Sequence, residues 1–273
     1  MPAFTHKQAG FTLVEMVIVI VITGIIGGMV AIFIRAPVQG YVDSARRAEL
    51  SDIADTALRR ISRDIRSAVP NSVRSTSATV EFLPTKDGGR YRADSGGNGN
   101  ILTFGTGGSA KFDIVGSAIN FAVGDYIVVG STQSDAVPAY DTSGSGVLRQ
   151  YTGSAGLQTI VSFTNTALPI WAELPSQRFD VVDGAQQAVF YKCETVGTDG
   201  SGNGTGKLMR YWSYGFTHIT GATKATLADK VSGCAIDYDV VNQRYSLLAM
   251  RLTLTSGGES VTLYNETHVN NSP

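Results

Sequence analysis

One carboxylate, Glu15, stands directly before nineteen uncharged residues, 16–34. An ionised carboxylate costs ~2.5–3.5 kcal/mol at the centre of a membrane helix and less near the interface, so such a residue usually has a partner. If the chain is cut before Phe11, the new α-amino group lies four residues from Glu15. Glu15 of one molecule could then neutralise the amine of a neighbour when such helices pack together. The alternative is that Glu15 simply lies at the membrane interface.

The sequence offers few other groups for chemistry. The three histidines lie far apart, and the short motifs of serine hydrolases, zinc proteases and P-loops are absent. The loop 197–206 carries Asp199, Ser201 and Asn203 in alternation, as calcium loops do. The twelfth position of a calcium loop that starts at Asp199, however, is Arg210 instead of the closing glutamate, so a flexible turn is the better interpretation. We therefore predict no catalytic residues, no metal site and no cofactor.

Two cysteines, Cys193 and Cys234, lie in the part of the chain that follows the apolar run, and neither belongs to a CxxC pair. An even number of cysteines in a domain that is exported through a membrane is typical of a disulfide, here a single one. That disulfide would close a loop of about 42 residues and stabilise the fold by about 4 kcal/mol in the chain-entropy model. The alternative is a pair of buried free thiols.

The apolar run at 16–34 has the length of a transmembrane helix. A buried core helix rarely runs this long without a polar face. A secretory signal peptide would have a shorter apolar stretch followed by a small-residue cleavage site, whereas here the run continues through Arg35 and Pro37 into more helix-like sequence. We predict that 11–34 spans a membrane.

The segment 48–74 has the periodicity of an amphipathic helix. Its apolar stripe consists of Leu50, Ala54, Ala57, Ile61, Ile65 and Ala68. Pro70 removes a backbone donor and ends the pattern, so one continuous helix is predicted over 11–68. The arginines of this segment alternate with acids, which favours a solvated helix face over a nucleic-acid patch. With a net charge of −1, no nucleic-acid partner is expected.

From residue 69 onward, glycine supplies 26 of 205 residues and short β-branched or aromatic runs alternate with polar turns. Strands are predicted at 78–83, 101–104, 126–129, 159–163, 188–193 and 207–211. The clearest pattern is a hairpin whose turn is Gly257-Gly258, because a glycine pair permits the positive φ angles of a primed turn. The predicted fold class is α+β, a long helix that carries a β-rich, loop-rich globular head at 69–273.

Gly10 followed by "FTLVE" and an apolar helix resembles the class III signal of type IV prepilins and type II secretion pseudopilins. The resemblance implies a leader peptide at 1–10, cleavage after Gly10, N-methylation of Phe11, and a role for Glu15 in subunit assembly. It also implies the lollipop architecture of pilins, in which the N-terminal helix carries the head.

Partners and location follow from the same resemblance. The implied partners are prepilin peptidase, other major and minor pilins through the N-terminal helix, and the inner-membrane assembly platform. The implied path begins with a single pass through the inner membrane, leader cytoplasmic and head periplasmic, and ends in a pilus at the cell surface. Many major pilins have a proline inside the apolar helix, whereas here the proline falls at Pro37.

Later segments resemble a narrower group. "ISRDIRSAVPNSVR", "GGRYR", "RFDVVDGAQQAVFYKC" and "HVNNSP" are similar to minor pilins of the mannose-sensitive haemagglutinin (MSHA) pilus and, more distantly, to J-type minor pseudopilins. The expected function is therefore that of a non-enzymatic minor pilin at or near the fibre tip. Two alternatives stay open: a pilus-delivered adhesin whose head binds a ligand, and a minor pseudopilin of type II secretion.

Overall fold

The chain is α+β, with a long N-terminal apolar helix followed by a β-rich head. The computed structural model describes residues 10–133, 137–164, 167–216, 221–239 and 245–273. The chain divides into two compact units, Met1–Glu49 and Leu50–Pro273. The second unit contains the last part of the long helix and all the strands.

The long helix, α1, runs over Leu13–Arg66 and continues through Pro37. The predicted helix at 11–68 is two residues too long at each end. At the start, Thr12 lies outside the helix and its carbonyl accepts the first helical hydrogen bond, from Met16 N–H at 3.2 Å. At the end, the Ser67 and Ala68 amides donate to carbonyls three residues back, at 3.2 and 3.0 Å, and so close a tighter last turn before Pro70.

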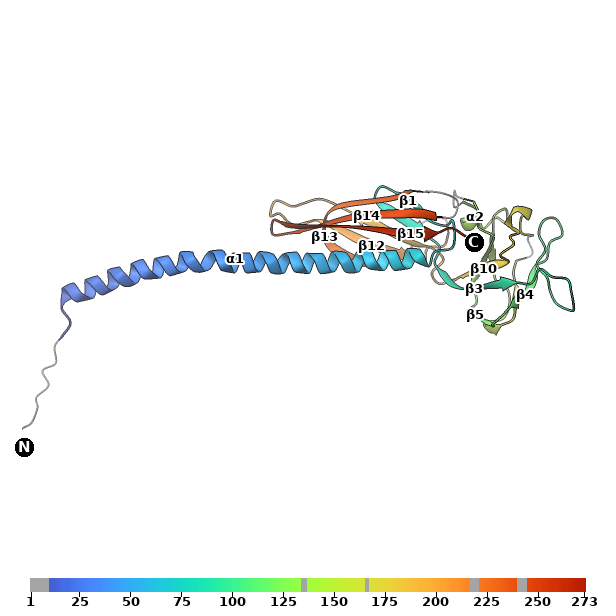
Figure 1. Cartoon of the computed structure of the whole chain (residues 1–273), viewed down its shortest axis with the longest axis horizontal. Helices are drawn as coiled ribbons and strands as arrows, with labels where there is room; N and C mark the ends of the chain where they lie inside the picture. Colours follow the sequence, from blue (N-terminus) through green and yellow to red (C-terminus); the bar gives the residue numbers. More distant parts are fainter. Residues whose placement is uncertain (1–9, 134–136, 165–166, 217–220, 240–244) are drawn as a thin grey trace, which may run out of the picture. The chain divides into compact units, whose positions relative to one another are not determined.

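The predicted apolar stripe of α1 is buried, which confirms the periodicity. The stripe residues Leu50, Ala54, Ala57, Ile61, Ile65 and Ala68 belong to one core cluster with side chains of the first sheet, such as Phe82, Tyr191 and Leu248. In Figure 1 the C-terminal part of α1 lies along the strands of that sheet. Helix and sheet therefore share one dry interface within the second unit.

Among the described residues, seven strands form the first sheet, and all its pairings are antiparallel. In spatial order they are β1 (Arg74–Thr76), β2 (Thr79–Phe82), β11 (Val189–Glu194), β12 (Gly206–Trp212), β13 (Thr223–Asp239), β14 (Tyr245–Ser256) and β15 (Glu259–Asn270). The hairpin β14–β15 turns at Gly257 and Gly258, with φ of 57° and 84°, as the glycine pair predicts.

A second sheet has six strands in the described part of the chain. In spatial order they are β7 (Leu148–Gln150), β6 (Tyr126–Val129), β10 (Arg178–Val182), β3 (Thr85–Tyr91), β4 (Lys111–Val115) and β9 (Ile160–Ser162). β5 (Ile119–Phe121) pairs with β8 (Gly156–Gln158), and two short helical segments, α2 (Val137–Tyr140) and η1 (Ile170–Ala172), complete the fold. Aromatic side chains fill this lobe, with Phe112 against Phe179 at 5.0 Å between ring centroids.

The strand predictions were right where the pattern was local. Those at 78–83, 126–129, 159–163, 188–193 and 207–211 overlap β2, β6, β9, β11 and β12. The prediction at 101–104 was wrong, because the Leu102 amide donates to Arg92 O and the Thr103 amide donates to the Ser109 hydroxyl instead of joining a ladder. β13 was not predicted, although it is the longest of the described strands.

Candidate functional site

The Gly10–Phe11 peptide bond lies in a non-helical segment that immediately precedes α1. Gly10 is exposed, and the Phe11 side chain is 79% exposed. Among the described residues, apart from the chain neighbours of Gly10, no heavy atom lies within 4 Å of the position that a Cβ on Gly10 would occupy. Exposed backbone outside regular structure is the preferred substrate of proteases, so this bond is accessible.

Thr12 begins the helix, a role that the sequence analysis missed. Its hydroxyl accepts a hydrogen bond from the Glu15 backbone N–H at 3.3 Å, which is the contact of an N-cap with the third helical residue. The signal for it was present, because Thr-x-x-Glu is the sequence of a capping box. Glu15 is also the acid in the first turn of α1, where the helix dipole favours a negative charge. The position of Glu15 therefore has a local structural reason as well as an electrostatic one.

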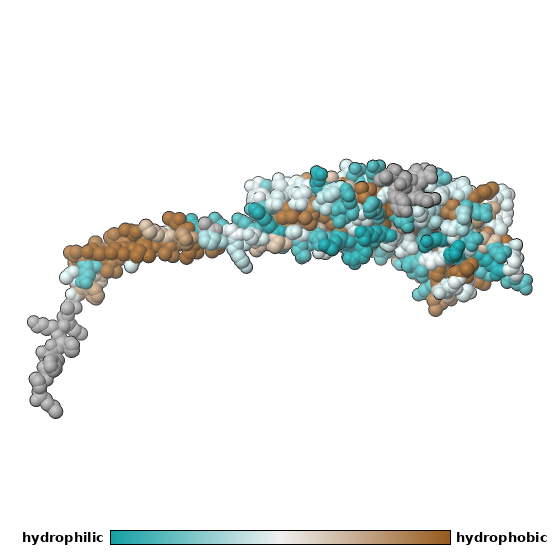
Figure 2. Space-filling view, in the orientation of Figure 1, coloured by the Kyte–Doolittle hydropathy of each residue, from teal (hydrophilic) through white to brown (hydrophobic). Residues whose placement is uncertain are grey.

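The apolar part of α1 is exposed along its whole length in the isolated chain. Large side chains from Leu13 to Ile34 are between 49% and 82% exposed. The space-filling view shows this part of the helix as a continuous apolar surface (Figure 2). Within it, the Thr23 hydroxyl donates to the Val19 carbonyl at 2.6 Å, so the one side-chain hydroxyl in 16–34 is satisfied inside the helix.

This helix is long and apolar enough to cross a membrane. Because it is unburied and begins near the N-terminus, it fits membrane anchoring. Exposed apolar surfaces of this extent mark sites that contact a membrane or another protein.

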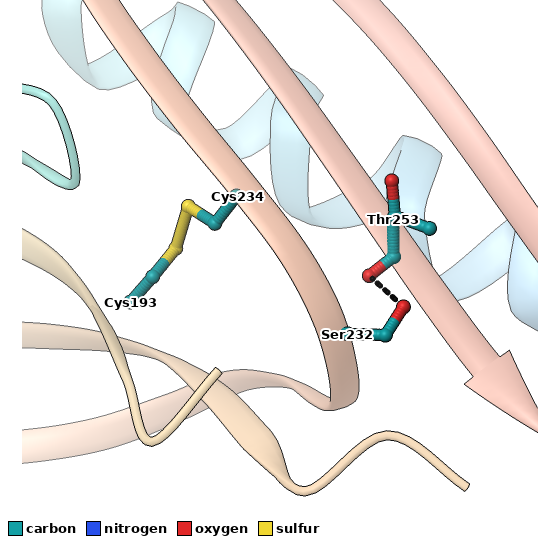
Figure 3. Close-up of a disulfide and its surroundings, with 4 residues drawn as sticks. All are labelled: Cys193, Ser232, Cys234 and Thr253. Atoms are coloured by element: carbon teal, nitrogen blue, oxygen red, sulfur yellow. Dashed lines mark hydrogen bonds between the residues drawn. A yellow bond between two sulfur atoms is a disulfide. The ribbon is translucent and has the colours of Figure 1, made fainter. Parts of the chain in front are cut away.

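Cys193 in β11 and Cys234 in β13 are joined, with an S–S distance of 2.00 Å (Figure 3). The two strands are separated by β12, yet the Cα atoms are only 6.4 Å apart. Across β12, Cys193 is opposite Leu208 and Leu208 is opposite Ala228, so Cys234 lies six residues further along β13. In a flat sheet the two Cα atoms would be well beyond the ~9.6 Å of two strand spacings, so the sheet curls strongly here. The Ile236 amide of β13 donates to the Ser77 carbonyl beside β1 at 3.0 Å, which shows the same curl. The disulfide thus fastens a curved sheet across its concave width.

The loop 197–206 is a turn that docks on the hairpin β14–β15. Backbone amides of Ser201 and Asn203 donate to one Asp199 oxygen at 2.9 and 2.8 Å, and these bonds hold the pKa of that carboxyl below its usual range. The Asn203 side-chain oxygen accepts from the Gly257 amide at 2.8 Å. Arg210 lies in β12, outside the loop. Asp199 therefore organises its own turn.

The described residues bring together no group of three or more His, Cys, Asp or Glu side chains that could hold a metal ion. His6 and His218 lie outside the described residues, and His268 is exposed on β15. The Tyr211 and Tyr214 side chains are packed: each is under 10% exposed, and their hydroxyls donate to Glu194 and Glu81, at 2.6 Å each.

Comparison with known proteins gives one match. Residues 5–31 match the family model described as the prokaryotic N-terminal methylation motif. No curated protein and no solved structure matches the chain. The matched segment contains Gly10, Phe11, Thr12 and Glu15 and the first part of the apolar helix, and it supports a type IV prepilin-like N-terminus of the kind that prepilin peptidase processes.

Proposed function

We propose that the chain is the precursor of a minor pilin, cut between Gly10 and Phe11 by prepilin peptidase and then N-methylated on Phe11. The observation that carries this proposal is the methylation-motif match over residues 5–31, which ends inside the exposed apolar helix. The accessible, non-helical bond before Phe11 supports it independently. The leader is then 1–10, the pilin helix 11–68, and the head 69–273.

Glu15 is the assembly residue in this proposal. After cleavage, the cationic amine of Phe11 stands just before the Thr12 cap, and the Glu15 carboxylate lies in the first helical turn. Within a bundle of apolar helices each of these charges is costly alone, and pairing Glu15 with the amine of a neighbouring subunit offsets both penalties. Pairing between molecules also fixes the axial register of one helix against the next.

The apolar segment 11–34 has two successive environments. It first anchors the precursor in the inner membrane, with the leader in the cytoplasm and the head in the periplasm. It then packs against the helices of other major and minor pilins when the assembly platform extracts the subunit into the pilus. The exposed apolar side chains and the internally satisfied Thr23 suit lipid and a helix bundle equally.

The head supports a place at or near the fibre tip, because a bulky two-sheet domain meets fewer neighbours there. The similarity of several segments to MSHA minor pilins favours an MshO-like subunit. A minor pseudopilin of type II secretion shares the same N-terminal chemistry, and the subunits that co-purify with the chain would distinguish the two. We assign the chain no enzymatic role and no cofactor.

The first test is the mass of the N-terminal peptide from native membranes or sheared pili. We expect a chain that starts at Phe11 and carries one added methyl group. A chain that retains residues 1–10 in cells with active prepilin peptidase would contradict the proposal.

The second test inverts the charge of the assembly residue. Glu15→Lys should leave the head folded but abolish incorporation into sheared fibres, because two cations would then face each other in the bundle. Asp52→Lys is the matched control, since Asp52 is exposed on the same helix, within the second unit. Normal incorporation of Glu15→Lys would overturn the assembly role.

A further inference from the structure

Two arginines lie directly opposite each other on neighbouring strands of the second sheet. Arg90 of β3 and Arg178 of β10 are register partners, so their side chains leave the same face. In the described part of the chain no carboxylate forms an ion pair with either guanidinium. Like charges in this arrangement destabilise a sheet unless an anion lies between them.

The space beside the two arginines is open. A hollow of about 420 Å³ is lined by Gly88, Gly89, Arg90, Ser176 and Arg178. A Cβ on Gly88 would lie 3.1 Å from the Phe179 carbonyl oxygen and 3.4 Å from an Asp180 carboxylate oxygen, so glycine fits this position more easily than a larger residue. The Arg90 Nε donates to the Ser176 carbonyl at 3.2 Å, which holds that guanidinium at the rim.

Ser176 lies where two hollows adjoin. Its hydroxyl is buried, and among the described side chains it is the one buried oxygen or nitrogen without a hydrogen-bond partner. Buried hydroxyls in native proteins are nearly always satisfied by protein, water or ligand. Ser176 lines both the arginine hollow and an adjoining hollow of about 390 Å³, whose other polar residues include Asn71, Thr132 and Ser272.

A third hollow, of about 270 Å³, shares Arg178 with the first and Ser272 with the second. It adds the Arg66 side chain from the last turn of α1. Asp180 is the one side-chain carboxylate among the residues that line the three hollows, and burial raises its pKa to about 6. The residues that line the groove formed by these three hollows therefore include three arginine side chains and one acidic side chain, and Pro273, whose terminal carboxylate is a second negative group, lines two of the hollows.

We propose that this groove binds an acidic saccharide, with a sugar carboxylate held between Arg90 and Arg178 and the sugar hydroxyls along the Thr132 and Ser272 side chains. The planar fork of arginine matches a carboxylate in bidentate geometry. The groove is larger than a single small anion needs, and the Thr132 and Ser272 hydroxyls in its lining suit a ligand rich in hydroxyls. This inference does not depend on the pilin proposal, because it concerns the head alone.

The test is calorimetric titration of the full chain in a polyoxyethylene detergent, which contains no sugar. The probe is trigalacturonate, and its fully methyl-esterified form is the matched ligand without charge. We expect binding of the acid and none of the ester. Equal binding of the two ligands, or binding of neither, would overturn the proposal, as would binding of a hexaglutamate peptide in place of the saccharide.

Variants locate the site. Arg178→Gln should weaken trigalacturonate binding by about tenfold or more, the size of one lost charge-assisted hydrogen bond. Arg251→Gln, on the exposed side of β14, is the control and should change nothing. Asp180→Asn keeps the shape of the groove and removes its acid, so it should tighten binding. Weakened binding in Asp180→Asn, or equal effects of the two arginine variants, would place the ligand elsewhere and overturn the proposal.

Discussion

The Thr12 hydroxyl accepts a hydrogen bond from the Glu15 amide at 3.3 Å, so the residue proposed to be the assembly acid is also the third residue of a capped helix. The cap fixes the residue at which α1 begins, and with it the position of the Glu15 carboxylate relative to the Phe11 amine. An uncapped start would let this first turn fray. Helix capping and subunit pairing therefore both depend on the five adjacent residues 11–15.

Replacing the cap tests this relationship. Thr12→Val keeps the side-chain shape but removes the acceptor, which should cost about 1 kcal/mol at the helix start. Hydrogen exchange of the Glu15 amide, measured in micelles, should become about fivefold faster. Thr12→Ser retains the hydroxyl and should exchange at the native rate. An unchanged Glu15 amide in Thr12→Val would show that the hydroxyl does not cap the helix.

The sequence predicted the elements whose signals are local. The stripe from Leu50 to Ala68 repeats at helical spacing. The Gly257-Gly258 pair lies in the sequence directly between the two strands of its hairpin. The order of the sheet was beyond such reasoning, because β2 pairs with β11 across more than a hundred residues. β13 was missed because its ladder with β12 shifts register twice and Lys230 adopts a positive φ within the strand, which interrupts any simple alternation.

The proposed sites divide in the same way, into residues that local sequence identifies and residues that only the folded chain brings together. Gly10, Phe11 and Glu15 stand in one contiguous motif and could be named from the sequence. The arginine groove could not, because Arg90 and Arg178 meet only when β3 pairs with β10. The Ser176 hydroxyl gives no sequence signal at all, since its lack of a partner is a property of the folded chain.

A partly buried polar cluster links the end of α1 to the first sheet. The Asp64 carboxylate accepts hydrogen bonds from the Tyr191 hydroxyl at 2.6 Å and from Arg210 Nε at 3.3 Å. Burial raises the pKa of Tyr191, so its hydroxyl stays protonated and donates. Because Tyr191 and Arg210 share one acceptor and are themselves 3.2 Å apart, their contributions to stability should not add.

A double-mutant cycle measures that coupling. Tyr191→Phe and Arg210→Met should show a coupling energy of about 0.5–3 kcal/mol in urea unfolding. The exposed pair Asp55 and Arg59, 2.6 Å apart on the same helix, is the control and should show no more than about 0.5 kcal/mol. Additive effects at Tyr191 and Arg210 would mean that the cluster does not act as a unit.

The disulfide should contribute a large part of the stability of the curled sheet. Cys193→Ala with Cys234→Ala should lower the free energy of unfolding by about 4 kcal/mol, the chain-entropy value for this loop. Adding reductant to the native chain should reproduce most of that loss. Ser232→Ala is a neighbouring control on β13: its hydroxyl donates to the Thr253 carbonyl at 3.3 Å (Figure 3), so about 1 kcal/mol is expected. The prediction would be wrong if adding reductant left the unfolding midpoint of the native chain unchanged.

Asp180 should make stability depend on pH in the direction opposite to most carboxylates. Its folded pKa of about 6 lies above the unfolded value near 3.9, so between these values the folded state holds a proton that the unfolded state has released. Stability contributed by this group is therefore present below about pH 4 and is lost as the pH rises through 6.

Asp180→Asn removes the titrating carboxyl group, and with it the loss of stability between pH 4 and pH 7. At pH 7 it should raise the free energy of unfolding by about 1–3 kcal/mol, and at pH 4 it should leave the value unchanged. Asp141→Asn is the control of opposite sign, because hydrogen bonds from Ser143 lower the pKa of Asp141, and its replacement should reduce stability at pH 7. Urea unfolding at the two pH values measures both variants. Asp180→Asn could instead leave the free energy of unfolding at pH 7 unchanged. The Asp180 carboxylate would then be well solvated or paired with a cation, and the excess of positive charge in the groove would be smaller than its three arginines indicate.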